Sequence, residues 1–159
     1  MRLLSLLTLL FLLFSCGNRD PFFDSESGDP SFVQKDLLDR SGLKFPSSMK
    51  CDCAFALCFQ DHLLWLKYEM DNLQLDSLEK LNGLKFRRGE VFYELRKSDK
   101  VGDCWKDSLL SRDSALVCEH TDSLSATRDF ITHFCLFSLE KKYRLYVFGM
   151  DVPKMESGN

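Results

Sequence analysis

The chain has 159 residues with 21 Lys and Arg against 24 Asp and Glu, and 45% of its residues are hydrophobic. The small acidic excess argues against a dedicated nucleic-acid binder, so we expect no nucleic-acid partner. This length predicts one domain with its own core, to which fourteen Phe residues can contribute.

The N-terminal residues predict a signal peptide over residues 1–15. Arg2 provides a positive charge, and the twelve residues from Leu3 to Phe14 are apolar except for Ser5 and Thr8. A stretch of this length is typical of a signal peptide and is shorter than the roughly 18 apolar residues that a transmembrane helix needs. The sequence therefore predicts an exported protein.

The leader ends in the sequence Leu13-Phe14-Ser15-Cys16. This sequence resembles the lipobox of bacterial lipoprotein precursors, in which a branched apolar residue and a small residue precede an obligatory cysteine. The resemblance implies cleavage before Cys16, lipid on the Cys16 thiol, and attachment to a membrane of the cell envelope on its non-cytoplasmic side. Two alternatives are an uncleaved anchor and cleavage by an ordinary signal peptidase that recognises Ser15 and Gly17, which would release a secreted protein.

Residues 16–31 are predicted to form a lipidated cysteine and a flexible tether, followed by a single globular domain at 32–152. The tether carries four acidic residues, two Pro and two Gly, and its only apolar pair is Phe22-Phe23. Such a composition is typical of solvated disorder. Fifteen flexible residues would span roughly 20 Å. Alternatively, the Phe pair docks on the domain or dips into the lipid interface.

The first half of the domain is predicted to contain a helix and a hairpin. The helix is expected from Phe32 to Leu43, with Gly42 at its end. Two apolar runs at 51–59 and 63–70 predict a hairpin whose second strand becomes polar on one face. A helix over 54–66 is the alternative for part of this region.

A second short helix and one strand are expected next. The capping-box pattern Asp76-Ser77-Leu78-Glu79 and the stop signal Asn82-Gly83 bound the helix. Alternating apolar residues predict a strand over 90–97. Residues 98–114 are charged and turn-forming, and they predict a long loop that Cys104 can staple.

Three strands complete the domain, at 115–119, 130–139 and 143–150, with a turn at 140–142 and a disordered tail at 153–159. These runs imply an α+β fold, with an antiparallel sheet built from hairpins and one or two short helices packed on one face.

In the last strand, Tyr143, Leu145 and Val147 share a face that has no charge, so we expect this face to be the buried one. The opposite face begins with Arg144, and we expect Arg144→Ala to have little effect on stability.

The order of these elements is similar to that of small bacterial lipoproteins of unknown function. The likeness rests on the opening sequence Gly42-Leu43-Lys44-Phe45-Pro46, the first hairpin, the leucine-rich helix over 76–81 and the final strand pair. It implies a lipoprotein domain and assigns no catalytic residue.

When Cys16 is set aside, an even set of six cysteines remains: Cys51, Cys53, Cys58, Cys104, Cys118 and Cys135. In an exported chain this set predicts up to three disulfides, whose pairing stays open. Because Cys51 and Cys53 lie two apart, a strand would place them on the same face, and each is expected to pair elsewhere. Alternatives are buried free thiols, or a soft metal held by the cluster Cys51, Cys53 and Cys58 with His62.

Candidate catalytic chemistry is limited to three histidines: His62, His120 and His133. A hydrolase triad would have to combine His120 with Asp122 and Ser123 or Ser125. Sequence neighbours rarely form a triad, and the Gly-x-Ser-x-Gly motif is absent. His133 is expected to be a core residue. We therefore assign no catalytic residue, no metal and no cofactor.

The sequence as a whole predicts a membrane-anchored envelope lipoprotein whose small domain binds or supports another envelope protein, without enzyme activity. Residues 85–106 hold seven basic and four acidic side chains, which could meet anionic headgroups or an acidic partner, or form a solvated mixed-charge face. The alternative functions are an exported hydrolase that uses one of the histidines, a small-ligand carrier, and a soluble secreted protein.

Overall fold

A computed structural model describes residues 22–24, 30–58, 62–97 and 103–154 of the chain. The predicted leader, Cys16 and the last five residues of the predicted tail lie outside these described residues. The leader and the lipid anchor therefore stay predictions.

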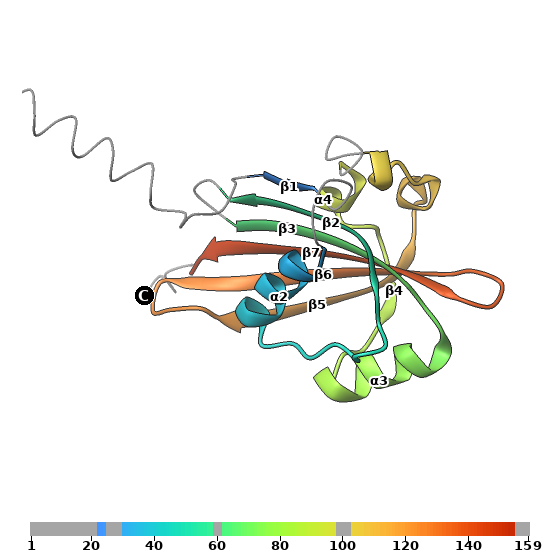
Figure 1. The fold of residues 1–159 in the computed structure, drawn as a ribbon, viewed down its shortest axis with the longest axis horizontal. Coiled ribbons are helices and arrows are strands. Elements are labelled where there is room, and N and C mark those ends of the chain that lie inside the picture. Colours follow the sequence, from blue (N-terminus) through green and yellow to red (C-terminus); the bar gives the residue numbers. More distant parts are fainter. Residues whose placement is uncertain (1–21, 25–29, 59–61, 98–102, 155–159) are drawn as a thin grey trace, which may run out of the picture.

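Seven strands form one antiparallel sheet in the order β1-β2-β3-β7-β6-β5-β4 (Figure 1). Their bounds are β1 (Phe22–Asp24), β2 (Cys51–Cys58), β3 (His62–Met70), β4 (Arg87–Gly89), β5 (Ala115–Ser123), β6 (Arg128–Ser138) and β7 (Tyr143–Pro153). Together with the helices described below, this arrangement confirms the predicted α+β class.

The centre of the sheet is made from hairpins, as predicted. The pair β2 and β3 and the pair β6 and β7 are each formed by strands that follow one another in the sequence. The β6–β7 turn falls at the predicted residues 140–142, where Leu139 and Lys142 exchange two backbone hydrogen bonds of 2.8 and 3.3 Å. Strand β3 pairs directly with β7, so two hairpins from distant parts of the chain meet in the middle of the sheet.

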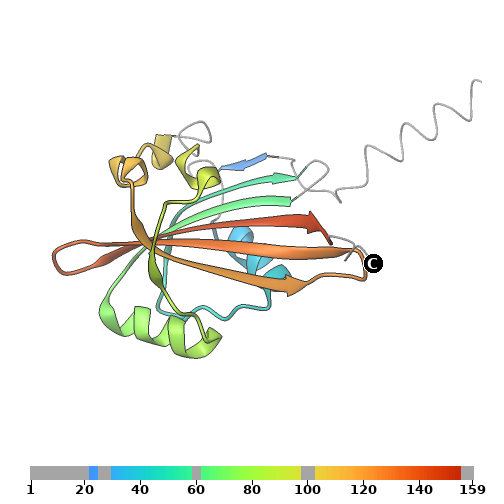
Figure 2. The same ribbon diagram turned by 180° about the vertical axis from the view of Figure 1, so that it is seen from behind.

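Helix α2 (Pro30–Ser41) covers one face of the sheet, which we call the first face. It lies in front of the sheet in Figure 1 and behind it in Figure 2. Pro30 suits the first turn because the N–H that it lacks would have no helical partner there, and Gly42 ends the helix with a φ of 63°. Val33 and Leu37 are the apolar side chains that the helix buries.

Strand β7 allows α2 to lie close to the sheet because it carries Gly149 opposite the helix. A Cβ atom at this position would lie 2.6 Å from Cζ of Phe130 and 3.2 Å from Cδ1 of Leu37. Any side chain here would therefore push the helix and the sheet apart.

Helix α3 (Asn72–Asn82) contributes Leu78 to the first face, and it begins earlier than predicted. The capping box predicted at residues 76–79 is wrong, because Asp71 and Gln74 form it instead. The Asp71 carboxylate accepts from the Gln74 N–H at 2.8 Å, and the Gln74 side chain accepts from the Asp71 N–H at 3.0 Å. The predicted stop is confirmed, since Gly83 has a left-handed φ of 64°.

The second face is covered by a strap, which we define as residues 91–97 and 103–112. The strap contains α4 (Tyr93–Arg96) and two 3₁₀ turns, η2 (Asp103–Trp105) and η3 (Ser108–Ser111). The strand predicted over 90–97 is therefore wrong. Val91, which precedes α4, and Leu95, which lies within it, are both buried in the second core.

Both faces of the final strand are buried, which corrects the expected burial of one face only. Leu145 and Val147 lie in the first core, whereas Tyr146 and Phe148 lie in the second core beneath the strap. Arg144 is half-buried, and its guanidinium lies 2.8 Å from Asp107 of the strap. Arg144, the charged residue on the face of Tyr146 and Phe148, therefore belongs to an ion pair and does not indicate a solvent-facing surface.

The ends of the domain differ slightly from the predicted boundaries. Phe22–Asp24 pairs with Phe55 to Leu57 of β2, so part of the predicted flexible tether is an edge strand. At the other end, β7 continues to Pro153, into the predicted tail.

Leu145→Ala should lower the free energy of unfolding by about 2–5 kcal/mol, because it removes apolar contacts and leaves a cavity in the first core. Leu116→Ala is a matched control, since Leu116 on β5 is 38% exposed, and it should cost less than about 1 kcal/mol. Denaturant titration of the two variants would measure both values. A larger loss for Leu116→Ala would contradict the central position of β7.

Candidate functional site

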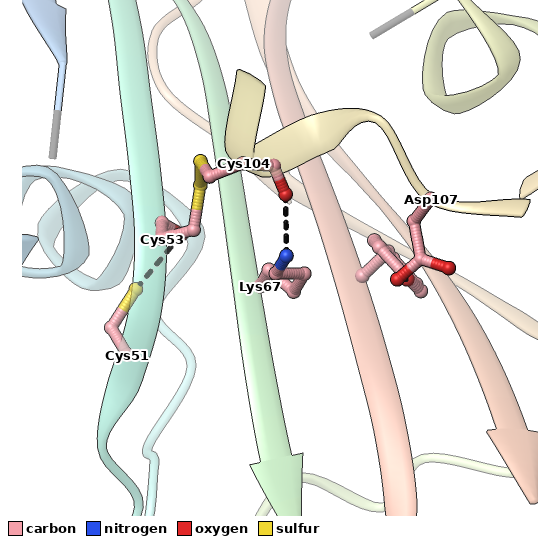
Figure 3. Close-up of a disulfide and its surroundings, with 6 residues drawn as sticks. Cys51, Cys53, Lys67, Cys104 and Asp107 are labelled. Atoms are coloured by element: carbon pink, nitrogen blue, oxygen red, sulfur yellow. Dashed lines mark hydrogen bonds between the residues drawn. A yellow bond between two sulfur atoms is a disulfide. The ribbon is translucent and has the colours of Figure 1, made fainter. Parts of the chain in front are cut away.

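A disulfide joins Cys53 of β2 to Cys104 of the strap (Figure 3). The two residues are 51 apart in the sequence, and their Cα atoms lie 6.4 Å apart. The bond ties the strap to the second face of the sheet, as the sequence predicted when it placed Cys104 in a stapled loop. Cys53 is almost completely buried, so the link belongs to the second core.

The remaining cysteines do not follow the prediction of further disulfides. Cys51, Cys118 and Cys135 are free thiols, and the side chain of Cys58 lies outside the described residues. Cys135 is fully buried in the second core, where it contributes apolar packing.

Cys51 and Cys53 point to opposite faces of β2, so the expectation that they share one face is wrong. The register shifts between these two residues, which marks an irregularity of the β-bulge type. As a result Cys51 packs against the first core and Cys53 lies in the second. Cys51 instead donates from its thiol to the Cys53 carbonyl at 3.2 Å (Figure 3).

A polar cluster fastens the strap beside the disulfide. Lys67 of β3 donates from Nζ to the carbonyl of Cys104 (Figure 3). The carboxylate of Asp107 accepts from the Leu109 N–H at 3.1 Å, from Arg144 at 2.8 Å and from the hydroxyl of Tyr146. Sequence analysis missed this cluster, although Asp107 before Ser108-Leu109-Leu110 is a recognisable capping position.

The pKa values in this cluster fit a structural role. Burial raises the pKa of the Asp107 carboxyl, but the hydrogen bonds from Tyr146, Leu109 and Arg144 outweigh it, so the pKa is lowered overall. Burial also lowers the pKa of the Lys67 ammonium, against which the charge of Asp107 acts. Each charged group is held by its partners, which stabilises the strap.

The free thiols next to this cluster are poor nucleophiles. Burial raises the pKa of Cys51 to about 11 and that of Cys135 to about 11. Since the thiolate is the reactive form, neither thiol is prepared to attack the Cys53–Cys104 bond at neutral pH.

The three candidate histidines lie in three separate surroundings. His62 lies 3.0 Å from Arg40 and 3.6 Å from the Asp36 carboxylate, and both partners belong to α2. His120 Nε2 lies 3.0 Å from the carbonyl of Ser41. No two of these rings are joined by an interaction within the described part of the chain, so the structure does not gather them into one site.

His133 is buried between strand and strap. Its Nε2 lies 3.1 Å from Glu119 on the neighbouring strand, and its ring stacks on Phe92 of the strap with a 4.0 Å centroid distance. On the other side Nδ1 lies 3.7 Å from Glu94, which is too long for a hydrogen bond. The predicted core position of His133 is confirmed.

The residues of the conceivable triad do not form a relay. Asp122 accepts from the Ser123 N–H at 2.9 Å, and Ser123 Oγ donates to the Ser125 carbonyl at 3.4 Å. His120 faces Ser41 instead of either serine. The hydrolase alternative therefore receives no support from this geometry.

The metal-site hypothesis also receives no support. Among the described residues, no group of three or more His, Cys, Asp or Glu side chains could hold a metal ion, and Cys53 is used by the disulfide. In the basic stretch, Lys85, Arg87, Arg88 and Arg96 are all exposed, and Arg96 also donates to the Val91 carbonyl within the strap.

A shallow hollow of about 210 Å³ lies at the start of α3, where it is lined by Ser48, Asp71, Leu73, Gln74 and Ser77. It includes none of the histidines or cysteines. Gln74 already donates to the Ser48 carbonyl at 2.9 Å across it, so its polar groups serve to dock the helix.

No protein-family model, curated protein or solved structure matches this chain. Among the helices of the described residues, none is both long enough and apolar enough to cross a membrane.

In the folded protein, iodoacetamide at about pH 8 should modify Cys51 and Cys135 slowly, because their raised pKa leaves little thiolate. Unfolding should accelerate both reactions, since it removes the burial that raises the pKa. Peptide mass spectrometry should also find Cys53 and Cys104 unmodified until a reductant is added. Equal rates for Cys135 in the folded and unfolded chains would contradict its burial under the strap.

Asp107→Asn should reduce the acid sensitivity of the fold. A carboxyl whose pKa is lower in the folded than in the unfolded protein contributes stability above the unfolded pKa, and this contribution is lost as the pH falls through the folded pKa. The free energy of unfolding should therefore fall more steeply in the wild type than in Asp107→Asn between about pH 5 and pH 2. If denaturant titration gave parallel pH profiles of the free energy of unfolding for the two proteins, the charge of Asp107 would not contribute to stability.

Proposed function

We propose that this protein is an exported lipoprotein, anchored to an envelope membrane by lipid on Cys16, whose domain binds or supports another envelope component. The observation that carries the proposal is the sequence Leu13-Phe14-Ser15-Cys16 after an apolar leader. A leader of this kind directs a chain out of the cytoplasm.

The Cys53–Cys104 bond supports this proposal. Disulfides persist in oxidising compartments and are rare in the cytosol, where thiols are kept reduced. In this protein the bond closes the strap over the second core, so the folded domain benefits from an environment that maintains it. The leader and the disulfide are thus both consistent with a location on the non-cytoplasmic side of the membrane.

The anchor would hold the domain close to the membrane by one edge. Cys16 lies six residues before Phe22, the first residue of β1, and six residues span at most about 20 Å. Strand β1 is one edge of the sheet, whereas α3 lies on the opposite side of the domain in both views (Figures 1 and 2). The α3 side is therefore free to meet another envelope component.

Helix α3 offers an apolar surface for such a contact. Leu73 and Leu81, near the two ends of the helix, are 77% and 53% exposed. Exposed apolar side chains of a helix are a common means of contact with a partner. This surface, in a domain whose histidines are held apart, favours a binding role over the hydrolase and carrier alternatives.

Cys16→Ser should abolish lipid attachment. Cells grown with radiolabelled palmitate should label the wild-type protein, and the wild type should partition into the detergent phase, because acyl chains are strongly apolar. Cys118→Ser is the matched control, since Cys118 is another free thiol, and it should behave like the wild type. Equal labelling of Cys16→Ser, or no labelling of the wild type, would overturn the proposal.

A further inference from the structure

The second face of the sheet is built from rows of side chains that lie directly opposite one another across the strands. The outermost complete row contains Leu57, Leu63, Met150 and Ile131, contributed by β2, β3, β7 and β6. Each is the register partner of the next: Leu57 with Leu63, Leu63 with Met150, and Met150 with Ile131. We call this set the end row.

The next row inward is aromatic and, apart from the partly buried Phe55, is buried. It contains Phe55, Trp65, Phe148 and His133, again as successive register partners. Phe55 and Trp65 have ring centroids 5.6 Å apart, and Trp65 and Phe148 have centroids 5.0 Å apart. Phe92 of the strap stacks on His133, so the strap reaches this row.

The end row remains partly exposed. All four of its side chains are apolar and of intermediate burial, whereas Trp65 and Phe148 in the next row are 8% and 2% exposed. On the first face the same end of the sheet is covered closely by α2, which reaches to within 3.2 Å of a Cβ position on Gly149. At this end of the sheet, the second face is therefore less covered than the first.

The predicted anchor enters the domain at this row. Phe22 of β1 is the register partner of Leu57, so the chain from Cys16 arrives beside the first member of the end row. Six residues span at most about 20 Å, and four neighbouring strands are about 14 Å wide from first to last. The whole end row thus lies within the distance over which a lipid on Cys16 can hold it to a bilayer.

We propose that the end row, Leu57, Leu63, Ile131 and Met150, rests on the surface of the bilayer in which the acyl chains of Cys16 are inserted. This inference rests on the proposed lipid anchor. Because the anchor keeps the domain at a high local concentration near the membrane, a weak apolar contact is sufficient to orient it. The contact holds the end row at the interface and turns the α3 side away from it.

Tryptophan fluorescence can test this contact in the acylated, full-length mature protein. The protein is reconstituted into phosphatidylcholine vesicles whose acyl chains carry bromine close to the headgroup, which quenches indole emission at short range. Trp65 lies two residues from Leu63 on the same face of β3, so its emission should be lost in part. Trp105 belongs to the strap itself, where its buried ring contacts Tyr146 away from the end row, and should report much less quenching.

The matched variants are Met150→Lys in the end row and Leu116→Lys on the first face of β5. Met150→Lys should abolish the quenching, whereas Leu116→Lys should retain it, because Leu116 is exposed but lies away from the end row. Ile131→Lys serves as a second end-row variant on another strand. Thermal melting and circular dichroism verify that each variant is folded before it is measured.

The outcomes separate this inference from the proposed function. An acylated protein without tryptophan quenching, or with quenching that Met150→Lys and Ile131→Lys both leave unchanged, would overturn the contact and leave the lipoprotein proposal standing. A mature protein whose intact mass shows no acyl chains would overturn the lipoprotein proposal itself. Self-association that the end-row variants abolish in solution would assign the row to a second copy of the chain and overturn the membrane contact.

Discussion

The central strands of this protein are apolar on both faces, and this constraint determines much of the rest of the structure. Leu145 and Val147 need one cover, and Tyr146 and Phe148 need another. Helix α2 can supply the first cover because Gly149 lets it approach the sheet. The second cover is a strap of very short helices, which gains little from regular backbone hydrogen bonding and so depends on attachment. The disulfide, the Lys67 hydrogen bond and the Asp107 cluster provide that attachment at neighbouring positions.

Much of the fold could be predicted from local patterns. The hairpin turn at 140–142 and the Gly83 stop depend on a few adjacent residues, and both were predicted correctly. Where prediction was wrong, two readings of the same residues competed. Val91, Tyr93 and Leu95 fit a strand by alternation, but Tyr93–Arg96 forms a short helix, and Val91 and Leu95 pack in the second core. Cys51 and Cys53 lie on opposite faces of β2 because of a β-bulge, and no local sequence pattern indicates this bulge.

The candidate site was less predictable because its parts come together only in three dimensions. Cys104 was recognised as a staple, but its partner could not be chosen among five other cysteines without the register of β2. Asp107 and Tyr146 are 39 residues apart in the sequence, and the capping position of Asp107 gives no indication that Tyr146 is its partner. The single Arg144 in an apolar strand was the best available clue, since a charge in such a position requires a partner. Its partner, Asp107, explains why both faces of β7 can be buried.

The long separation between Cys53 and Cys104 has a consequence for the order of events during biogenesis. Closing a loop of this length restricts the unfolded chain and stabilises the fold by about 4 kcal/mol in the chain-entropy description. In a chain exported as proposed, this contribution is missing until the chain reaches an oxidising compartment. The precursor then stays less stable than the mature protein, which favours the unfolded, translocation-competent state before export and a locked domain after it.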